Sequence, residues 1–370
     1  MLKKTIRRLG ALAMVLAMAV SVFAVNASAV DSEQKQPTPD ITKNIVKEAG
    51  VYLPEATFTF NAVADGKSTD TKYDTPTADE ALKATKGVLG TIKSEPKDSD
   101  LTKTEVEVGK LTISVNKTAF KGPGTYYYKI TETGSYDGMK YDSAPRTFIV
   151  MIGANNEVLS YGFINSKENH TKNDGVFTNI YKDEGTHKGP HDLVIEKKVI
   201  GNAYDASLTY DFWVTITNKN GTKEWYNVVS SKTTTNSTKI EAGTRTKITV
   251  AKDETVTIKG LSPQDTYIVE EADYTGDAYK YEDPTATKQV GTEPASTLEL
   301  KKTTNDKDQT TTFKSNSVTM QDANNTVTVT NKKDFATPGG VIMTIAPYAL
   351  MVVLAGAFAV VFLSRRNRAE

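Results

Sequence analysis

Apolar and polar residues alternate along most of the chain between its two ends, and this alternation limits the fold more than any other feature. Stretches with this period of two include Leu111–Val115, Tyr126–Ile130 and Phe212–Ile216. Successive side chains of a β-strand point to opposite faces, so the period predicts strands with one buried face. Turn signals separate the stretches, among them Gly122-Pro123-Gly124 and Asn220-Gly221. The sequence therefore predicts an all-β fold.

Composition excludes several classes of function. The 45 basic and 45 acidic residues give a net charge of zero, so nothing indicates a nucleic-acid partner. The chain has no Cys and three His, which excludes disulfides, thiolate metal sites and cysteine nucleophiles. We therefore expect no enzyme activity, no cofactor and no bound transition metal. Whether a calcium ion binds at the acidic pairs Asp98/Asp100 or Asp306/Asp308 is left open by the sequence.

The N-terminus is typical of a cleaved secretory signal. Basic residues precede an apolar stretch from Leu9 to Val25, and Ala27-Ser28-Ala29 is the small-residue pattern at which such signals are cut. Residues 1–29 are therefore expected to be removed.

The C-terminus carries an apolar stretch, Val341 to Leu363, whose 23 residues can span a bilayer and are followed by a basic tail. A small-residue motif precedes this stretch: Ala336-Thr337-Pro338-Gly339-Gly340. The order of motif, apolar stretch and basic tail resembles a Gram-positive sortase sorting signal. Gly339 stands where that family usually has Thr, which leaves the class of sortase open.

A polar, glycine-containing segment, residues 182–192, divides the middle of the chain. We predict an N-terminal β-domain over 30–181, a linker over 182–192, a C-terminal β-domain over 193–334 and the sorting region over 335–370. The linker holds His187 and His191, a weak candidate for a metal site. One helix is predicted from Ala78 to Lys86, because Thr77 and Glu80 form a capping-box pattern.

In the second domain, three polar residues interrupt the apolar faces of predicted strands. Lys197 shares a strand face with three aliphatic residues, Glu271 follows a second apolar stripe, and Asn331 ends a third. The neighbouring residues Lys198 and Glu270 are competitors, but they fall on the opposite faces. A buried Lys or Glu is costly unless it is paired or neutralised.

The first domain repeats this order with Lys43, Glu132 and Asn179. Lys47 is the alternative to Lys43 on the same stripe. Burial lowers the pKa of a lysine and raises that of a glutamate, so the lysine becomes a neutral nucleophile beside a protonated acid. Such a pair can attack the Asn carboxamide and expel ammonia. The repeated order predicts an intramolecular isopeptide bond in each domain.

These residues also carry a family resemblance. The strings Tyr126–Glu132, Phe177–Asn179 and Val329–Phe335 resemble the glutamate and asparagine motifs of streptococcal-type major pilins, and Leu193–Val199 resembles a reactive-lysine strand. The resemblance implies two immunoglobulin-like (CnaB-like) β-sandwiches in tandem. It also implies bonds Lys43–Asn179, assisted by Glu132, and Lys197–Asn331, assisted by Glu271.

The same resemblance implies a structural function. In that family a pilin-specific sortase cuts the sorting motif and joins the new end to a lysine of the next subunit; the matching lysine here is Lys172, with Lys167 as the alternative. The chain is thus expected to be a major pilin, polymerised with identical subunits and minor pilins and anchored to the peptidoglycan of a Gram-positive surface. The alternative is a wall-anchored monomeric adhesin or minor pilin that binds a host ligand.

Overall fold

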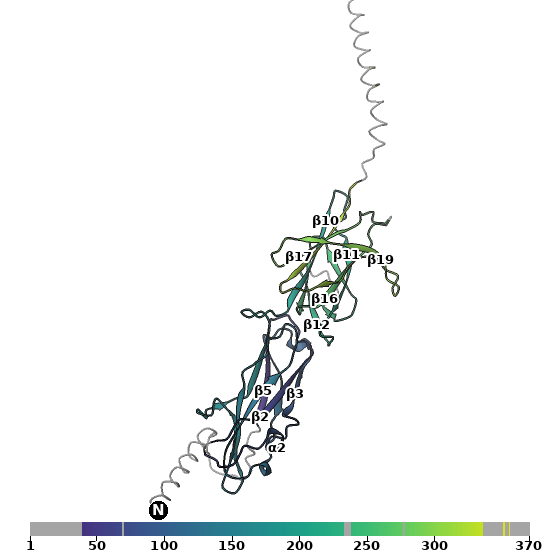
Figure 1. Ribbon diagram of the computed structural model, residues 1–370. Coiled ribbons are helices and arrows are strands. Elements are labelled where there is room, and N and C mark those ends of the chain that lie inside the picture. Colours follow the sequence, from purple (N-terminus) through teal and green to yellow (C-terminus); the bar gives the residue numbers. More distant parts are fainter. Residues whose placement is uncertain are drawn as a thin grey trace, which may run out of the picture.

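The computed structural model describes residues 39–335, except positions 69, 233–237 and 277, together with Met351 and Ala355. Within this part of the chain the strands form two lobes placed end to end (Figure 1). Each lobe has its own hydrophobic core, the first between residues 41 and 181 and the second between residues 193 and 329. Each lobe consists of two sheets, which confirms the prediction of an all-β protein with tandem sandwiches.

The first lobe joins a three-stranded sheet to a six-stranded sheet. The three-stranded sheet runs in the order β4 (Glu105–Thr112), β1 (Asp40–Lys47) and β9 (Val176–Tyr181). The six-stranded sheet runs in the order β3 (Val88–Ser94), β2 (Ala56–Ala64), β5 (Gly124–Thr133), β6 (Arg146–Ile152), β7 (Val158–Ile164) and β8 (Lys172–Asn173). Helix α2 (Ala78–Ala81) and two 3-10 turns, η1 (Asp98–Asp100) and η2 (Lys117–Ala119), lie in its connections.

The second lobe is built from a seven-stranded and a six-stranded sheet. The larger sheet runs in the order β13 (Lys239–Glu241), β12 (Trp225–Ser230), β15 (Thr255–Leu261), β10 (His191–Ile200), β22 (Asn325–Lys332), β17 (Thr285–Val290) and β18 (Ser296–Leu298). The smaller sheet contains β14 (Thr246–Ala251), β11 (Thr209–Thr217), β16 (Thr266–Ala272), β20 (Thr311–Ser315) and β19 (Leu300–Thr304), and β21 (Val318–Thr319) pairs with β16.

In both lobes the first and last strands are parallel neighbours. β1 pairs with β9, and β10 pairs with β22, each over most of its length. Because parallel neighbours run in the same direction, the chain enters each lobe at one end of this pair and leaves at the other.

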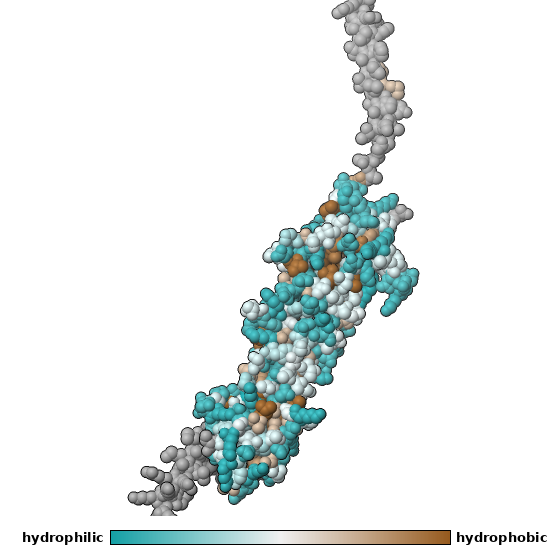
Figure 2. Space-filling model, in the orientation of Figure 1, coloured by the Kyte–Doolittle hydropathy of each residue, from teal (hydrophilic) through white to brown (hydrophobic). Residues whose placement is uncertain are grey.

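The alternation seen in the sequence is also the pattern of burial. Along β1 the side chains of Ile41, Lys43, Ile45 and Lys47 are buried and those between them are half-buried. The inward aliphatic and aromatic side chains of both sheets meet in the core, where each contributes about 1.5–3 kcal/mol relative to exposure. The outer surface is largely hydrophilic on the face shown in Figure 2, with small apolar patches.

The predicted helix starts correctly but is shorter than expected. The Thr77 hydroxyl accepts a hydrogen bond from the Glu80 backbone N–H (3.3 Å), and the Glu80 carboxylate accepts one from the Thr77 N–H (3.0 Å). The helix ends at Ala81 instead of Lys86, because Lys83 and Lys86 adopt left-handed φ values of 55° and 53°. Such φ values cannot continue a right-handed helix.

The two ends of the chain lie outside the described residues. These are the predicted signal peptide (1–29), the sorting motif (336–340), the apolar stretch 341–363 apart from Met351 and Ala355, and the basic tail. Among the residues that are described, no helix is long and apolar enough to cross a bilayer. The predicted linker, 182–192, includes the first two residues of β10.

Candidate functional site

The first candidate cluster lies between the two sheets of the N-terminal lobe. Lys43 on β1 is the register partner of Phe177 on β9, and Asn179 follows two residues later on the same face. Glu132 reaches the same point from β5 in the opposite sheet. Lys43 and Asn179 have no exposed surface and Glu132 is 8% exposed. Two sheets thus bring together three polar groups that are distant in sequence.

Short contacts connect these three side chains. The Lys43 Nζ lies 3.0 Å from Glu132 Oε2 and donates to the Phe177 carbonyl oxygen at 3.2 Å. The Asn179 Nδ2 donates to the other carboxylate oxygen, Glu132 Oε1, at 2.7 Å. The carboxyl group of Glu132 therefore bridges the lysine amine and the asparagine amide.

The second cluster repeats the strand positions and the lysine–glutamate contact of the first in the C-terminal lobe. Lys197 on β10 is the register partner of Val329 on β22, and Asn331 again follows two residues later. The Lys197 Nζ lies 3.2 Å from Glu271 Oε1 and donates to the Val329 carbonyl oxygen at 3.2 Å. Glu271 comes from β16 in the opposite sheet. The lysine, its partner residue and the asparagine occupy the same relative positions in both lobes.

Burial shifts the pKa values of both pairs toward their neutral forms. It lowers the pKa of Lys43 and of Lys197 to about 8, although the neighbouring carboxylates oppose this shift. Burial raises the pKa of Glu132, and it raises that of Glu271 to about 7. In each pair the apolar surroundings penalise both charged forms at once.

These pKa shifts lower the free energy of the state in which the lysine and the glutamate are both uncharged. Between a lysine of pKa 10.5 and a glutamate of pKa 4.5, moving the proton to the carboxylate costs about 8 kcal/mol. Burial brings the pKa values of Lys197 (about 8) and Glu271 (about 7) close together, so the same transfer costs far less in the folded chain. A neutral amine beside a protonated carboxyl group is therefore close in free energy to the ion pair.

Further residues of these clusters were not predicted from the sequence. The Asn179 carbonyl oxygen accepts a hydrogen bond from the Asp142 backbone N–H at 2.9 Å, which polarises the amide from outside the Lys–Glu pair. The ring of Phe58 lies 5.0 Å from the Lys43 Nζ, and that of Tyr210 lies 4.6 Å from the Lys197 Nζ. Asp142 is in a loop between β5 and β6, and no periodic pattern marks it.

The competing residues have other surroundings. Lys47 is also buried, but its Nζ donates to three backbone carbonyls, those of Glu48, Leu101 and Lys103. Glu270 is buried on the opposite face of β16, where Arg245 binds it at 2.9 Å. Lys198 is exposed. Of the candidates on these strands, Lys43 and Lys197 are the lysines that contact the predicted glutamates.

The two lysines considered for joining subunits differ in their contacts. Lys172 is exposed on β8, the outermost strand of its sheet. Lys167 lies 3.1 Å from the Asp65 carboxylate and stacks over the ring of Tyr127. Tyr127 also contacts His170 at 2.9 Å, so the loop before β8 is held against the sheet. These contacts favour Lys172 as the accessible amine.

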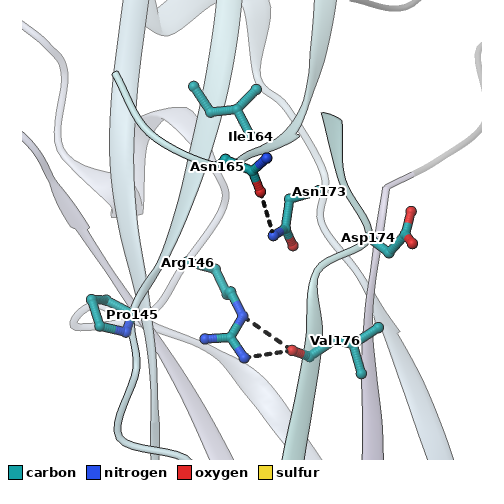
Figure 3. A pocket seen from close by; sticks show the side chains of 7 residues that line it. All are labelled: Pro145, Arg146, Ile164, Asn165, Asn173, Asp174 and Val176. Atoms are coloured by element: carbon teal, nitrogen blue, oxygen red, sulfur yellow. Dashed lines mark hydrogen bonds between the residues drawn. The ribbon is translucent and has the colours of Figure 1, made fainter. Parts of the chain in front are cut away.

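An open hollow of about 400 Å³ adjoins β8. Among the lining side chains in Figure 3, Arg146 donates two hydrogen bonds to the Val176 carbonyl oxygen (3.0 and 2.8 Å) and Asn173 donates one to Asn165 (3.1 Å). The hollow is lined mainly by polar side chains and lies next to Lys172 along the chain.

Candidate metal ligands do not gather in the part of the chain that the structure describes, where no group of three His, Asp or Glu residues could hold an ion. His187 contacts the Gly138 carbonyl oxygen at 3.2 Å, and His191 lies 3.6 Å from Asp183. Asp98 accepts a hydrogen bond from Tyr52, and Asp308 pairs with Arg245.

Comparison with protein families agrees with this geometry. Residues 39–182 match the family described as "Spy0128-like isopeptide containing domain", and residues 191–333 match a family described as a domain of unknown function. A protein named pilin from Streptococcus pyogenes serotype M1 is 26% identical over 340 residues, which cover 88% of this chain and 90% of that protein.

Solved structures share the fold. The crystal structure of the major pilin from Streptococcus pyogenes aligns with a TM-score of 0.53 at 20% identity, over 80% of this chain and 98% of its own. The T-13 major pilin of the same species aligns with a TM-score of 0.52 at 19% identity, over 80% of this chain and 97% of its own.

The fold is a tandem β-sandwich, and its first lobe matches the family of isopeptide-containing domains, whose pilin members are structural and not catalytic. Over most of its length the chain is similar to a streptococcal pilin, which agrees with the resemblance that its motifs carry.

In the Asn331→Ala variant, Lys197 has no asparagine with which to form an amide. The ionisation of the Lys197–Glu271 pair can therefore be measured by itself in this variant. The raised pKa of Glu271, about 7 against 4.5, means that the folded chain holds this proton more tightly than the unfolded chain. The protonated Glu271 carboxyl group therefore adds to the free energy of unfolding. This stabilisation is complete below about pH 4.5 and is lost as the pH rises through about 7. Urea unfolding across this range is expected to show a loss of about 3 kcal/mol.

The matched control is the double variant Asn331→Ala/Glu271→Gln, which has no carboxyl group at position 271. Its free energy of unfolding is expected to change less over the same pH range, by the amount assigned to Glu271. Equal pH dependence in the two variants would show that Glu271 titrates normally in the folded chain.

Proposed function

We propose that this chain is a pilin subunit in which each sandwich is closed by a Lys–Asn isopeptide bond and which sortase joins to identical subunits. The observation that carries the proposal is the Lys–Glu–Asn cluster repeated at the same register in both lobes. A single buried Lys–Glu contact is adequately explained as a structural ion pair. Its recurrence with an asparagine at the same offset favours a common chemistry.

In the proposed reaction the lysine nitrogen replaces the side-chain nitrogen of the asparagine. The neutral Lys43 Nζ attacks the side-chain carbonyl carbon of Asn179, a new C–N bond forms, and the bond to Nδ2 breaks. Glu132 takes the proton that the amine loses and gives a proton to the departing Nδ2, which leaves as ammonia. The contacts of Glu132 with both nitrogens support this relay. Lys197, Glu271 and Asn331 would react in the same way.

Each bond would join the first strand of a lobe to its last strand. The closed loop contains more than a hundred residues, and in the crosslink-entropy description such a loop stabilises the fold by roughly 4–5 kcal/mol. Tension along the chain would then pass through the amide, so the intervening strands would not have to unzip. This property suits a shaft that bears load without disulfides.

For polymerisation, we infer that Lys172 accepts the carboxyl end of the next subunit. Its exposure on the outermost strand β8 supports this role, and the ion pair of Lys167 with Asp65 makes that lysine a poorer nucleophile. The hollow beside β8 leaves room for an incoming chain end. The cut would fall within the motif Ala336–Gly340.

The signal-like N-terminus and the sorting motif support export and attachment to the peptidoglycan of a Gram-positive cell. Partners would be identical subunits, a pilin-specific sortase and minor pilins. The pilin relative from Streptococcus pyogenes supports a place in a surface pilus.

Intact mass spectrometry tests the internal bonds. The mature wild-type protein is expected to be lighter than its sequence by two ammonia molecules, because each bond expels one. Glu132→Ala and Glu271→Ala should each restore one ammonia, since each removes the proton relay of one lobe. Glu270→Ala is the control, because this neighbouring buried glutamate faces away from the cluster, and it should keep both losses. A wild-type mass equal to the sequence mass would exclude the bonds.

Cell-wall extracts test polymerisation. On denaturing gels the wild type is expected to form a ladder of high-mass species in a cell that carries its sortase. Lys172→Ala should collapse the ladder to monomer, whereas Lys167→Ala should leave it. A ladder that survives Lys172→Ala rejects this acceptor, and a wild type without any ladder favours a wall-anchored monomeric adhesin.

A further inference from the structure

Two acidic side chains are buried where the lobes meet, outside both Lys–Glu–Asn clusters. Glu224, which precedes β12, is 1% exposed, and Asp265, which precedes β16, has no exposed surface. The first lobe contributes Tyr136, from the loop after β5, and Tyr181, the last residue of β9. No lysine or arginine forms an ion pair with either acid among the described residues.

Glu224 is the point at which hydrogen bonds from both lobes converge. Tyr136 donates to its Oε2 at 3.0 Å and Tyr181 donates to its Oε1 at 2.9 Å, both across the junction. From the second lobe, Tyr226 donates to Oε2 at 3.1 Å and the Asn218 amide is also in contact. Removal of the carboxyl group would leave two hydroxyls of the first lobe without their shared acceptor.

One contact at this site lacks a hydrogen atom when both acids are ionised. The Tyr226 hydroxyl lies 3.1 Å from Glu224 and 3.2 Å from Asp265, but it has one hydrogen to donate. Asp265 also accepts from the backbone N–H groups of Ser262 and Lys219, each at 2.9 Å. Both contacts of Tyr226 become hydrogen bonds only when one of the acids holds a proton.

The electrostatic surroundings favour the same state. Burial, together with the charge of Asp265, raises the pKa of Glu224 to about 8. Burial, with a smaller contribution from the charge of Asp137, raises the pKa of Asp265 to about 6. The other titratable groups that face Glu224 are the three tyrosines, whose own pKa values burial also raises.

The rest of the junction is closely fitted. The ring of Tyr52 in the first lobe packs edge-on against Trp225, with ring centres 5.6 Å apart. Asn227 donates to the Gly50 carbonyl oxygen at 3.0 Å. A Cβ at Gly260 would lie 2.8 Å from the Val51 side chain, so this glycine permits the close approach. These contacts bring the two lobes close together around the buried acids.

We propose that Glu224 and Asp265 share one proton and form a lock that fixes the orientation of the two sandwiches through Tyr136 and Tyr181. When the pair loses this proton, two negative charges remain buried on either side of the Tyr226 hydroxyl and the junction loosens. The lock is independent of the isopeptide bonds, since each of those bonds lies within one lobe.

Spin-label distances in the full-length chain test this lock. The chain has no cysteine, so Thr91→Cys on β3 and Thr287→Cys on β17, both exposed positions in different lobes, can be labelled uniquely. One narrow distance distribution is expected at about pH 6, and a broader one at about pH 9, on either side of the Glu224 pKa of about 8.

Two variants on this labelled background decide the outcome. Glu224→Gln cannot ionise and is expected to keep the narrow distribution at both pH values. Tyr136→Phe combined with Tyr181→Phe removes the two donors of the first lobe and is expected to broaden the distribution already at about pH 6. Tyr267→Phe is the control, because it removes a buried hydroxyl contact with Asn325 inside the second lobe and should leave the distribution narrow.

The proposal is overturned if the Tyr136→Phe/Tyr181→Phe variant keeps the narrow wild-type distribution. It is equally overturned if Glu224→Gln broadens with pH as the wild type does. Circular dichroism at both pH values verifies that each variant keeps its strands, so that broadening reports orientation and not unfolding.

Discussion

The buried contact between a lysine amine and a glutamate carboxyl is the interaction on which each sandwich depends. An unpaired charge in these apolar cores would cost several kcal/mol. The lysine, the glutamate and the asparagine must therefore be in contact with one another in the folded core. That requirement fixes the register of the first and last strands, because a slip of one residue would turn Lys43 or Lys197 outward. The surrounding aromatic rings complete a site from which water is excluded.

Much of this arrangement could be predicted from local sequence. Lys197, Glu271 and Asn331 are visible because each interrupts an apolar stripe with a period of two, and that period survives in the burial of the strands. The choice of Lys43 over Lys47 could not be settled in this way, since both occupy the same face of β1. The structure separates them by what the opposite sheet offers: Glu132 faces one, and backbone carbonyls surround the other.

Features that depend on loops and on contacts between lobes escaped prediction. The Asp142 N–H that polarises Asn179 comes from a loop without periodicity. Glu224, Tyr136 and Tyr181 lie far apart in the sequence, and singly each reads as an ordinary polar or aromatic residue. The helix that begins at Ala78 stopped early because Lys83 takes a left-handed conformation, and no glycine or proline at that position announces the stop.

The parallel pairing of β1 with β9 and of β10 with β22 gives each module a head and a tail at opposite poles. If the first and last strands were antiparallel, the chain would leave each lobe at the end where it entered. A second lobe would then lie beside the first and not beyond it. With the observed pairing, duplication of one module lengthens the rod along its axis. The length of such a protein can therefore change by whole lobes, while the lobes remain in one line and point in the same direction.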